Sequence, residues 1–272
     1  MYSKCTRYIT DNIGKIVSGS EFNEYCDSQN SDFFKTILRN NMMNYSRNYQ
    51  YKVGLNTSND KLDKNGLTFS PTDKIWKYVD FGELLVDIKV PDNTNVFISS
   101  NYELKADDLI IENPTIWHEN YKLCLEAIKD NGFALYYVKT QTPELCIEAV
   151  KQDGLMLRYV YIKTQKICLS AVKQNGLALQ YVFDQTPEIC LEAVKQNGMA
   201  LQYVVTQTPQ LCLEAVQQNG MAIQYVKTKT PKLCIEAVKQ NGMALQYIKT
   251  QTPEVRMEAV KQNKDASIYI KT

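Results

Sequence analysis

The chain has 272 residues, 44% of them hydrophobic, and a formal net charge of +1 at pH 7. This length predicts one or two domains, and the small net charge argues against a general preference for nucleic acid or anionic membranes. No apolar run approaches the roughly 18 residues of a membrane-spanning helix, and the first residues lack the apolar segment of a signal peptide. We therefore expect a cytoplasmic protein without membrane association.

The first 115 residues mix helical and extended patterns. Weak helical patches at 8–16 and 21–25 precede a better helix, which Ser31 and Asp32 would cap and whose apolar side would run from Phe33 to Met42. Further along, alternation and breakers predict strands at 49–53, 66–69, 84–90, 96–98 and 109–111, a polar loop at 56–65, a short helix from Ser70 to Val79 and a turn at 91–93. We expect a helical N-terminal segment at 1–44 and a small α+β module at 45–115, with Ile116, Trp117 and Tyr121 packing its end against the next part.

From residue 116 to residue 272 the sequence repeats with a period of 22. Each regular copy carries one cysteine, and these are Cys124, Cys146, Cys168, Cys190, Cys212 and Cys234. A fixed period of about 20–50 residues is typical of proteins built from stacked repeats. One copy is too small to fold alone, so neighbouring copies must stabilise one another.

The copy that starts at Thr186 illustrates the first element of a repeat. Thr186 can cap a helix whose first residue is Pro187. Asn197 and Gly198 should end this helix, with Gly198 in the left-handed conformation that is common after helices. The apolar stripe of the helix would consist of Ile189, Cys190, Ala193 and Val194.

The second element of this copy has two possible structures. Ala200, Tyr203 and Val204 follow helical spacing. Met199, Leu201 and Tyr203 also alternate like a strand, which would give the horseshoe of a leucine-rich repeat. We favour the helix because most copies carry alanine at the position of Ala200, and a small residue suits close helix–helix contact. The predicted fold is mainly α: a right-handed α-solenoid of short two-helix repeats, preceded by the small α+β domain.

The final copy differs from the others in a way that suits the exposed end of a stack. Arg256 replaces the cysteine, Lys264 the glycine and Asp265 the apolar residue after it. Terminal repeats of solenoids need a polar outer side, so we predict a C-terminal capping repeat.

The cysteines of the regular copies should be buried, reduced thiols. Successive packed helices lie about 8–10 Å apart, whereas a disulfide needs Cα atoms within about 7 Å. The sequence has no Cys-x-x-Cys motif or Cys/His cluster to indicate a metal site. We expect a reducing, intracellular environment and neither metal nor cofactor.

Several short motifs lie in the N-terminal module: Tyr49-x-Tyr51-Lys52-x-Gly54-Leu55-Asn56, Gly66-Leu67-x-Phe69, Phe81-Gly82, Ile88-x-Val90-Pro91-Asp92 and Lys105-Ala106-Asp107. Together they resemble a module of giant, mimivirus-like DNA viruses that commonly stands before ankyrin repeats. That family usually has a Cys- and Gly-rich approach to its Gly-Leu-x-Phe strand, where this chain has Asp63-Lys64-Asn65. The resemblance implies a viral protein, in the host cytoplasm or the virion.

The repeats carry a second resemblance, over residues 124–262. Their pattern, Thr-Pro-Glu-Ile-Cys-Leu-Glu-Ala-Val-Lys-Gln-Asn-Gly from Thr186 on, is similar to short repeats of unknown function found in giant viruses and some intracellular bacteria. Neither resemblance carries established catalytic residues, so neither assigns an activity.

Few residues are candidates for catalysis. His118 is the only histidine, and no local nucleophile or carboxylate motif accompanies it, so we expect a structural role beside Trp117. Asp107 and Asp108 suit a solvated turn better than an acid–base or metal pair. The strand residues that could line a pocket, but more often form core, are Tyr49, Tyr51 and Lys52. We predict that the protein is not an enzyme; a cryptic activity in residues 45–112 is an alternative.

Lysines recur on the first helix of the repeats, at Lys129, Lys151, Lys173, Lys195 and Lys239. Such a ladder could follow the phosphates of a nucleic acid, so a nucleic-acid-binding solenoid is a further alternative. Glutamates lie three residues earlier on the same face in four copies, at Glu126, Glu148, Glu192 and Glu236. We favour a solvated, salt-bridged face and expect nucleic acid not to be the partner.

One position of the repeat varies along the chain. The two residues that follow the second helix are Lys-Thr in the outer copies, whereas the middle copies differ. The middle copies present Tyr161, Ile162, Phe183, Asp184 and Val205. In stacked repeats these side chains would form one continuous patch, which is typical of protein interfaces, unless they are tucked into the local core. We predict a non-catalytic scaffold that binds a host or viral protein through this patch, with no small-molecule ligand.

Overall fold

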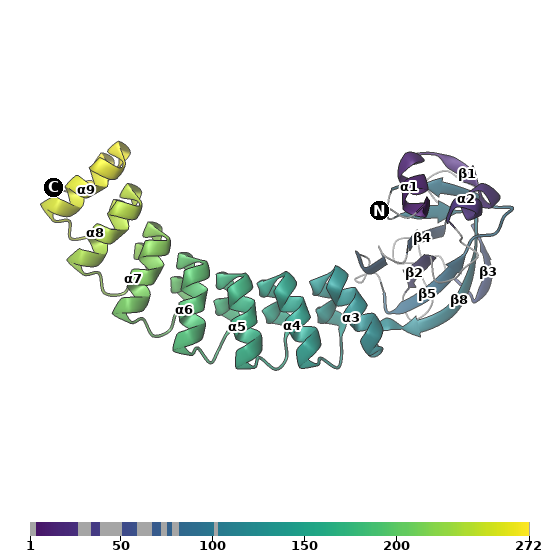
Figure 1. The fold of residues 1–272 in the computed structure, drawn as a ribbon, viewed down its shortest axis with the longest axis horizontal. Coiled ribbons are helices and arrows are strands. Elements are labelled where there is room, and N and C mark those ends of the chain that lie inside the picture. Colours follow the sequence, from purple (N-terminus) through teal and green to yellow (C-terminus); the bar gives the residue numbers. More distant parts are fainter. Residues whose placement is uncertain are drawn as a thin grey trace. The chain divides into compact units, whose positions relative to one another are not determined.

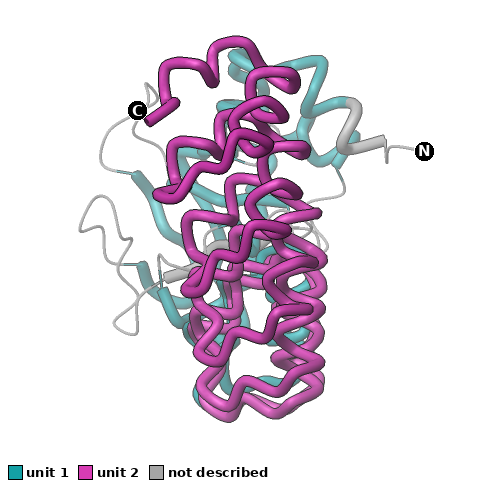
Figure 2. Tube along the Cα trace, turned by 90° about the vertical axis from the view of Figure 1, so that its left-hand side faces the viewer, with its two compact units in different colours: residues 1–140 teal, residues 141–272 magenta. Residues whose placement is uncertain are grey.

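The computed structural model describes residues 4–26, 34–38, 51–58, 67–71, 75–77, 82–100 and 103–271. The chain forms two compact units, Met1–Thr140 and Gln141–Thr272, which are coloured separately in Figure 2. The first unit holds a β-sheet and the first helical repeat. The second unit consists of the later repeats.

The first unit is built around an antiparallel sheet. Within the described residues its strands are β1 (Ile16–Ser18), β2 (Phe34–Leu38), β3 (Gly54–Thr57), β4 (Leu67–Pro71), β5 (Leu84–Lys89), β6 (Asn95–Ile98), β7 (Leu104–Ala106) and β8 (Asp108–Ile116). They lie in the order β1-β6-β7-β4-β2-β5-β8-β3, and every neighbouring pair is antiparallel. Two short helices, α1 (Lys4–Asp11) and α2 (Gly19–Cys26), accompany the sheet (Figure 1).

The core of this unit joins the two short helices to the sheet. Phe22 of α2 is fully buried and meets the ring of Phe69 of β4 edge-on, with ring centroids 6.1 Å apart. Along β5, β6 and β7, apolar residues such as Ile88, Val96 and Leu104 are fully buried. Burial of these side chains supplies most of the free energy that holds such a small unit together.

Several of the elements predicted here are confirmed. The strands predicted at 66–69, 84–90, 96–98 and 109–111 correspond to β4, β5, β6 and β8, and the turn follows Pro91. Of the two weak helical patches, the first overlaps α1 and the second lies in α2, with β1 between them. The short helix predicted from Ser70 is wrong at its start, because Ser70 and Pro71 belong to β4 and only residues 75–77 form a 3-10 turn. Strand β7 was not predicted, and Val79 lies outside the described residues.

β2 is a strand where the sequence predicts a helix. It pairs with β4 on one side and with β5 on the other, and Lys35 lies opposite both Ser70 and Asp87. The predicted helix is therefore wrong over β2, and its end near Met42 lies outside the described residues. A short apolar run fits either period, and the backbone partners that decide the outcome come from far along the chain.

β3 begins directly after the strand that was predicted at 49–53. Gly54 has a φ of 95°, a left-handed conformation that glycine adopts without strain. The side chain of Asn56 accepts a hydrogen bond from the backbone N–H of Lys52 and donates one to its carbonyl, both at 2.8 Å. These bonds close a turn at residues 52–56, so the strand predicted at 49–53 is wrong there, although Tyr51 is buried as core.

The first unit also contains the first repeat, formed by α3 (Tyr121–Asp130) and the 3-10 helix η3 (Gly132–Tyr137), after the 3-10 helix η2 (Trp117–Glu119). Trp117 is fully buried, and its ring centroid lies 5.6 Å from that of Trp76 and 6.2 Å from that of Tyr137. Its packing role is therefore confirmed. Ile116 and Tyr121 are exposed, so the same prediction is wrong for them.

The second unit is a regular stack of helix pairs. The α-helices are α4 (Pro143–Gln152), α5 (Gln165–Gln174), α6 (Pro187–Gln196), α7 (Pro209–Gln218), α8 (Pro231–Gln240) and α9 (Pro253–Gln262). Each is followed by a six-residue 3-10 helix: η4 (Gly154–Tyr159), η5 (Gly176–Tyr181), η6 (Gly198–Tyr203), η7 (Gly220–Tyr225), η8 (Gly242–Tyr247) and η9 (Lys264–Tyr269). The α-helices of this unit stand side by side in chain order (Figure 1). The two-helix repeat is confirmed, and the strand alternative for its second element is wrong.

The ends of α6 show how the sequence sets the length of a helix. The Thr186 hydroxyl accepts a hydrogen bond from the Ile189 N–H, and Pro187 occupies the first helical turn, as predicted. At the other end, Asn197 is extended, with φ −151° and ψ 109°, and its side chain accepts a hydrogen bond from the Met199 N–H. One asparagine thus ends the α-helix and caps the 3-10 helix that follows.

Gly198 is not left-handed, so the prediction for it is wrong. Within the described residues, the glycines with positive φ are Gly14 and Gly54. Gly198 is required by close approach instead, because a Cβ there would lie 2.4 Å from the carbonyl oxygen of Ala215 in α7. The Gly198 N–H also donates to the Gln218 side chain at 2.6 Å, and the same bond recurs from Gly154 to Gly242. The recurring glycine therefore fixes how closely the next repeat packs.

Candidate binding face of the repeats

The loops that leave each 3-10 helix carry the residues singled out from the sequence. Their side chains are strongly exposed: Tyr161 by 67%, Ile162 by 78%, Phe183 by 86% and Val205 by 68%. Asp184 is exposed as well. These five residues are called the binding face below. Their exposure rules out the alternative that they are tucked into the local core.

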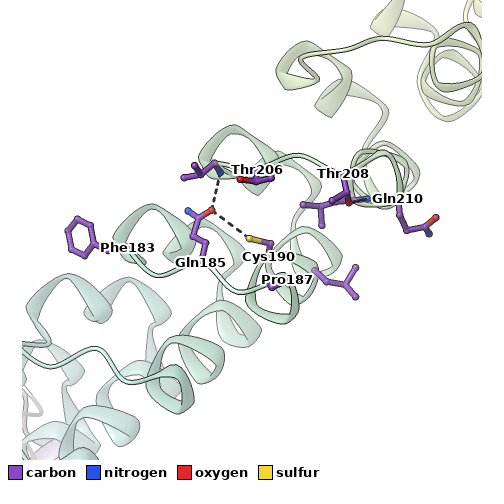
Figure 3. Close-up of a pocket in the computed structure, with 10 residues that line it drawn as sticks. Phe183, Gln185, Pro187, Cys190, Thr206, Thr208 and Gln210 are labelled. Atoms are coloured by element: carbon purple, nitrogen blue, oxygen red, sulfur yellow. Dashed lines mark hydrogen bonds between the residues drawn. The ribbon is translucent and has the colours of Figure 1, made fainter.

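The binding face borders two hollows between consecutive repeats. One hollow, of about 520 Å³, is lined by Tyr161, Ile162, Lys163 and Phe183, among others. The next, of about 380 Å³, lies between Phe183 and Val205 and is lined mainly by apolar atoms. Phe183 lines both hollows, and Figure 3 shows its ring projecting from the loop, away from Gln185. The structure thus brings the predicted residues together along one edge of the stack.

Most of these loops are tied to the next repeat by a glutamine side chain. The Oε1 atom of Gln185 accepts from the Val205 N–H at 3.0 Å, and its Nε2 atom donates to the Tyr203 carbonyl at 2.8 Å. The Cys190 thiol also donates to Oε1 at 3.6 Å (Figure 3). The glutamines that bridge two repeats in this way are called loop glutamines: Gln141, Gln185, Gln207 and Gln251.

Two junctions depart from this arrangement because lysine replaces the loop glutamine. The ammonium group of Lys163 donates to the Val160 carbonyl of its own repeat at 2.9 Å, and Lys229 does the same to Val226. Lys163 also lies near the Phe183 ring, 5.8 Å from its centroid. Sequence reasoning did not single out Lys163. The sequence does mark this residue, because Lys163 stands at a repeat position that is glutamine in most copies.

The cysteines of the repeats are free and buried, as predicted. Burial raises the pKa of Cys146 to about 11 and holds the pKa of Cys190 and Cys212 above the usual value. A thiol with a raised pKa is a poor nucleophile at neutral pH, because the reactive form is the thiolate. These cysteines therefore pack the stack and are not candidates for catalysis.

His118 occupies a structural position in the first unit. It is 95% buried beside Trp117, and its Nε2 atom lies 3.6 Å from the Glu83 carboxylate. Its Nδ1 atom has no hydrogen-bond partner among the described residues. The expected structural role fits this buried environment beside Trp117.

The remaining candidates of the N-terminal module have structural surroundings. Asp107 follows β7 and accepts a hydrogen bond from the Asn95 side chain at 3.0 Å, while the backbone N–H of Asp108 donates to Thr94. Tyr51 is buried and Lys52 is exposed, and Tyr49 lies outside the described residues. Within the described ranges, no three His, Cys, Asp or Glu side chains lie close enough to hold a metal ion.

Lysines on the first helix of the repeats form ion pairs of two kinds. Lys173 lies 3.9 Å from Glu192 of the following repeat, so this pair links neighbouring copies. Lys261 of the final copy, which is not part of the predicted ladder, pairs with Glu258 three residues earlier, at 3.5 Å. Exposed pairs of this kind are worth about 0–1 kcal/mol each, so they keep the face polar without holding the stack together.

Comparison with protein families matches only the repeats. The family model described as Domain of unknown function (DUF4116) matches residues 120–163, 142–186, 164–207, 186–230 and 208–251. Comparison with curated proteins and with solved structures found no match. None of the described helices is both long enough and apolar enough to cross a membrane. The repeats of this chain are thus similar to a family whose description assigns no activity.

Proposed function

We propose that this protein is a non-catalytic scaffold that binds another protein, of the host or of a virus, through the binding face. The observation that carries the proposal is a contrast within each repeat. The apolar stripe of α6, formed by Ile189, Cys190, Ala193 and Val194, is at most 6% exposed, whereas the apolar residues of the binding face are 67–86% exposed. Exposed apolar patches of this kind mark interaction sites in soluble proteins.

The size of the patch indicates the strength of such a complex. Burying a large apolar side chain contributes about 1.5–3 kcal/mol, and aromatic residues are the usual energetic centres of interfaces. Association costs about 4–15 kcal/mol in lost freedom of movement, which is of the same order as four such side chains supply. The hollows beside Tyr161 and Phe183 must therefore also be filled, and the partner should enter them with its own side chains.

The test is affinity capture from host cells, comparing the intact chain with the variant Tyr161→Lys/Phe183→Lys. Lysine occupies these positions in the outer copies, so the variant should fold. The matched control is Met257→Lys/Ile268→Lys, which removes two exposed apolar side chains away from the binding face. We expect the first variant to lose specific partners and the control to keep them. Equal capture by both variants would refute the proposal.

The intact chain and its variants also test the two alternative functions, nucleic-acid binding and a cryptic enzyme. A nucleic-acid-binding solenoid would shift nucleic acid in a gel, with an affinity that falls steeply as salt rises. Loss of that shift on replacing Lys151, Lys195 and Lys239 by Gln, with no effect of the Tyr161→Lys/Phe183→Lys variant, would favour it. A cryptic enzyme in residues 45–112 would still turn over a substrate in the Tyr161→Lys/Phe183→Lys variant, because that variant changes only the binding face.

A further inference from the structure

The junction at Lys163 differs from its neighbours in hydrogen bonding. At the loop-glutamine junctions, an oxygen of the glutamine accepts from the backbone N–H of the next loop, at 3.0 Å for both Tyr161 and Val205. Phe183 is the equivalent residue after Lys163. Among the described residues, no group accepts a hydrogen bond from the Phe183 N–H. Lysine has only donors, so it cannot replace the missing acceptor.

The position of the Lys163 ammonium group sharpens this difference. It donates to the Val160 carbonyl of its own repeat, whereas the loop glutamines Gln185 and Gln251 donate to the tyrosine carbonyl of the next repeat, at 2.8 and 2.9 Å. The ammonium group therefore bonds to a different carbonyl from the one that the glutamine nitrogen binds, and among the described residues no atom takes the place of the glutamine oxygen. Phe183 and the positively charged Lys163 both line the hollow at this junction.

We propose that this junction binds a side-chain carboxylate, of aspartate or glutamate, from an extended partner segment whose flanking apolar side chains fill the two hollows. The carboxylate would accept from the Phe183 N–H and pair with the Lys163 ammonium group, which still has two free donors. Hydrogen bonds of this charge-assisted kind are roughly twice as strong as neutral ones. The inference rests on the proposed function and names the partner chemistry for the same face.

The surroundings favour an acidic segment with apolar neighbours over a bare anion. Tyr161, Ile162 and Phe183 line the hollow beside Lys163, and the adjoining hollow is lined by Val205 and Leu211. Asp184 carries the opposing charge, but it is exposed, so water screens it. Its replacement by asparagine should therefore strengthen binding modestly, by about twofold to fivefold, as for removal of one screened surface charge.

The repeat itself supplies the variant that tests the inference. Lys163→Gln restores the residue of the loop-glutamine junctions, so it should close the site while adding the hydrogen bonds that hold the other loops. Lys229→Gln makes the same change three repeats later, where the neighbouring loop residues are Lys227 and Lys249 and not apolar. Both variants should fold and unfold at a temperature no lower than that of the parent.

The probe is a mixture of five-residue peptides that are blocked at both ends. The central residue is always glutamate, and the four flanking positions are varied among Leu, Phe, Tyr and Val. A matched mixture carries glutamine at the centre. Binding to the full chain is followed by the amide resonance of Phe183 in a nitrogen–proton correlation spectrum. We expect the glutamate mixture to shift this resonance. The affinity should fall at least tenfold when the glutamine mixture is used, and equally when the glutamate mixture binds the Lys163→Gln variant. The Lys229→Gln variant should bind the glutamate mixture with unchanged affinity.

Three results would overturn the inference: no shift of Phe183 with the glutamate mixture, equal shifts with both mixtures, or an undiminished shift in Lys163→Gln. If one of these results is found and partner capture still depends on Tyr161 and Phe183, the carboxylate inference is rejected and the scaffold proposal stands. If partner capture does not depend on Tyr161 and Phe183, the scaffold proposal itself is rejected.

Discussion

Replacing Gly198 by alanine should loosen the contact between two repeats. The added Cβ would lie 2.4 Å from the Ala215 carbonyl oxygen and 2.8 Å from the Gln218 Oε1 atom. The Ala215 oxygen cannot simply move aside, because it accepts the N–H of Asn219 at the end of α7. The following repeat must therefore shift, or the glutamine bond must break.

The expected cost follows from these contacts. Overpacking of this kind costs about 1–3 kcal/mol, and loss of the Gln218 bond costs about 0.5–1.5 kcal/mol more. Alanine offsets part of this, by about 0.4–1 kcal/mol, because it restricts the unfolded chain. We expect a net loss of about 0.5–4 kcal/mol, measured as a lower midpoint of urea unfolding by far-ultraviolet circular dichroism.

Lys264 provides the control, since it stands at the same position of the final copy and is exposed. Lys264→Ala should change the free energy of unfolding by no more than about 0.5 kcal/mol, as is usual at the surface. If Gly198→Ala were as stable as the parent, the close approach of glycine to the next helix would not be what sets the repeat spacing.

Three further predictions concern the end of the stack, the thiols and the binding face. Removal of residues from Pro253 on would uncover the side of α8 and η8 that Val255 and Ala259 now cover. The shortened chain should therefore unfold at a lower urea concentration and associate, as measured by light scattering. An equally stable, monomeric product would contradict this. Native Cys146 should react slowly with iodoacetamide at pH 8, because its pKa of about 11 leaves little thiolate. The rate of labelling should rise toward pH 11 and on unfolding. Fast labelling of the native protein would show that the thiol is accessible. Tyr161→Lys/Phe183→Lys should change stability by about 0.5 kcal/mol or less, since both side chains are exposed, and a clear loss of the unfolding transition would mean that they support the fold.

The sequence was sufficient for features that depend on neighbours within one helix. Thr186, Pro187 and the apolar stripe of α6 act locally, so the helix start and its buried side could be predicted from them. Comparing copies of the repeat singled out Tyr161 and Phe183, because equivalent positions in a stack share one environment, but their exposure is a finding of the structure.

Features that depend on distant partners could not be predicted in this way. β2 is a strand because β4 and β5 lie on either side of it, and those partners are not visible in its own residues. The role of Gly198 depends on a carbonyl of the next helix, and that of Gln185 on the N–H of Val205, twenty residues later. The recurrence of glycine and glutamine marked these positions, but the contacts that explain them needed coordinates.

Site-specific photo-crosslinking in host cells tests the central claim most directly. A photoreactive phenylalanine analogue is placed at Phe183 and, in a matched chain, at Lys249, which is exposed at the same position of an outer copy. We predict a discrete crosslinked protein from position 183 that is absent from position 249 and disappears when Tyr161 is also changed to lysine. No adduct from position 183, or the same adduct from both positions, would contradict a protein-binding role for this face.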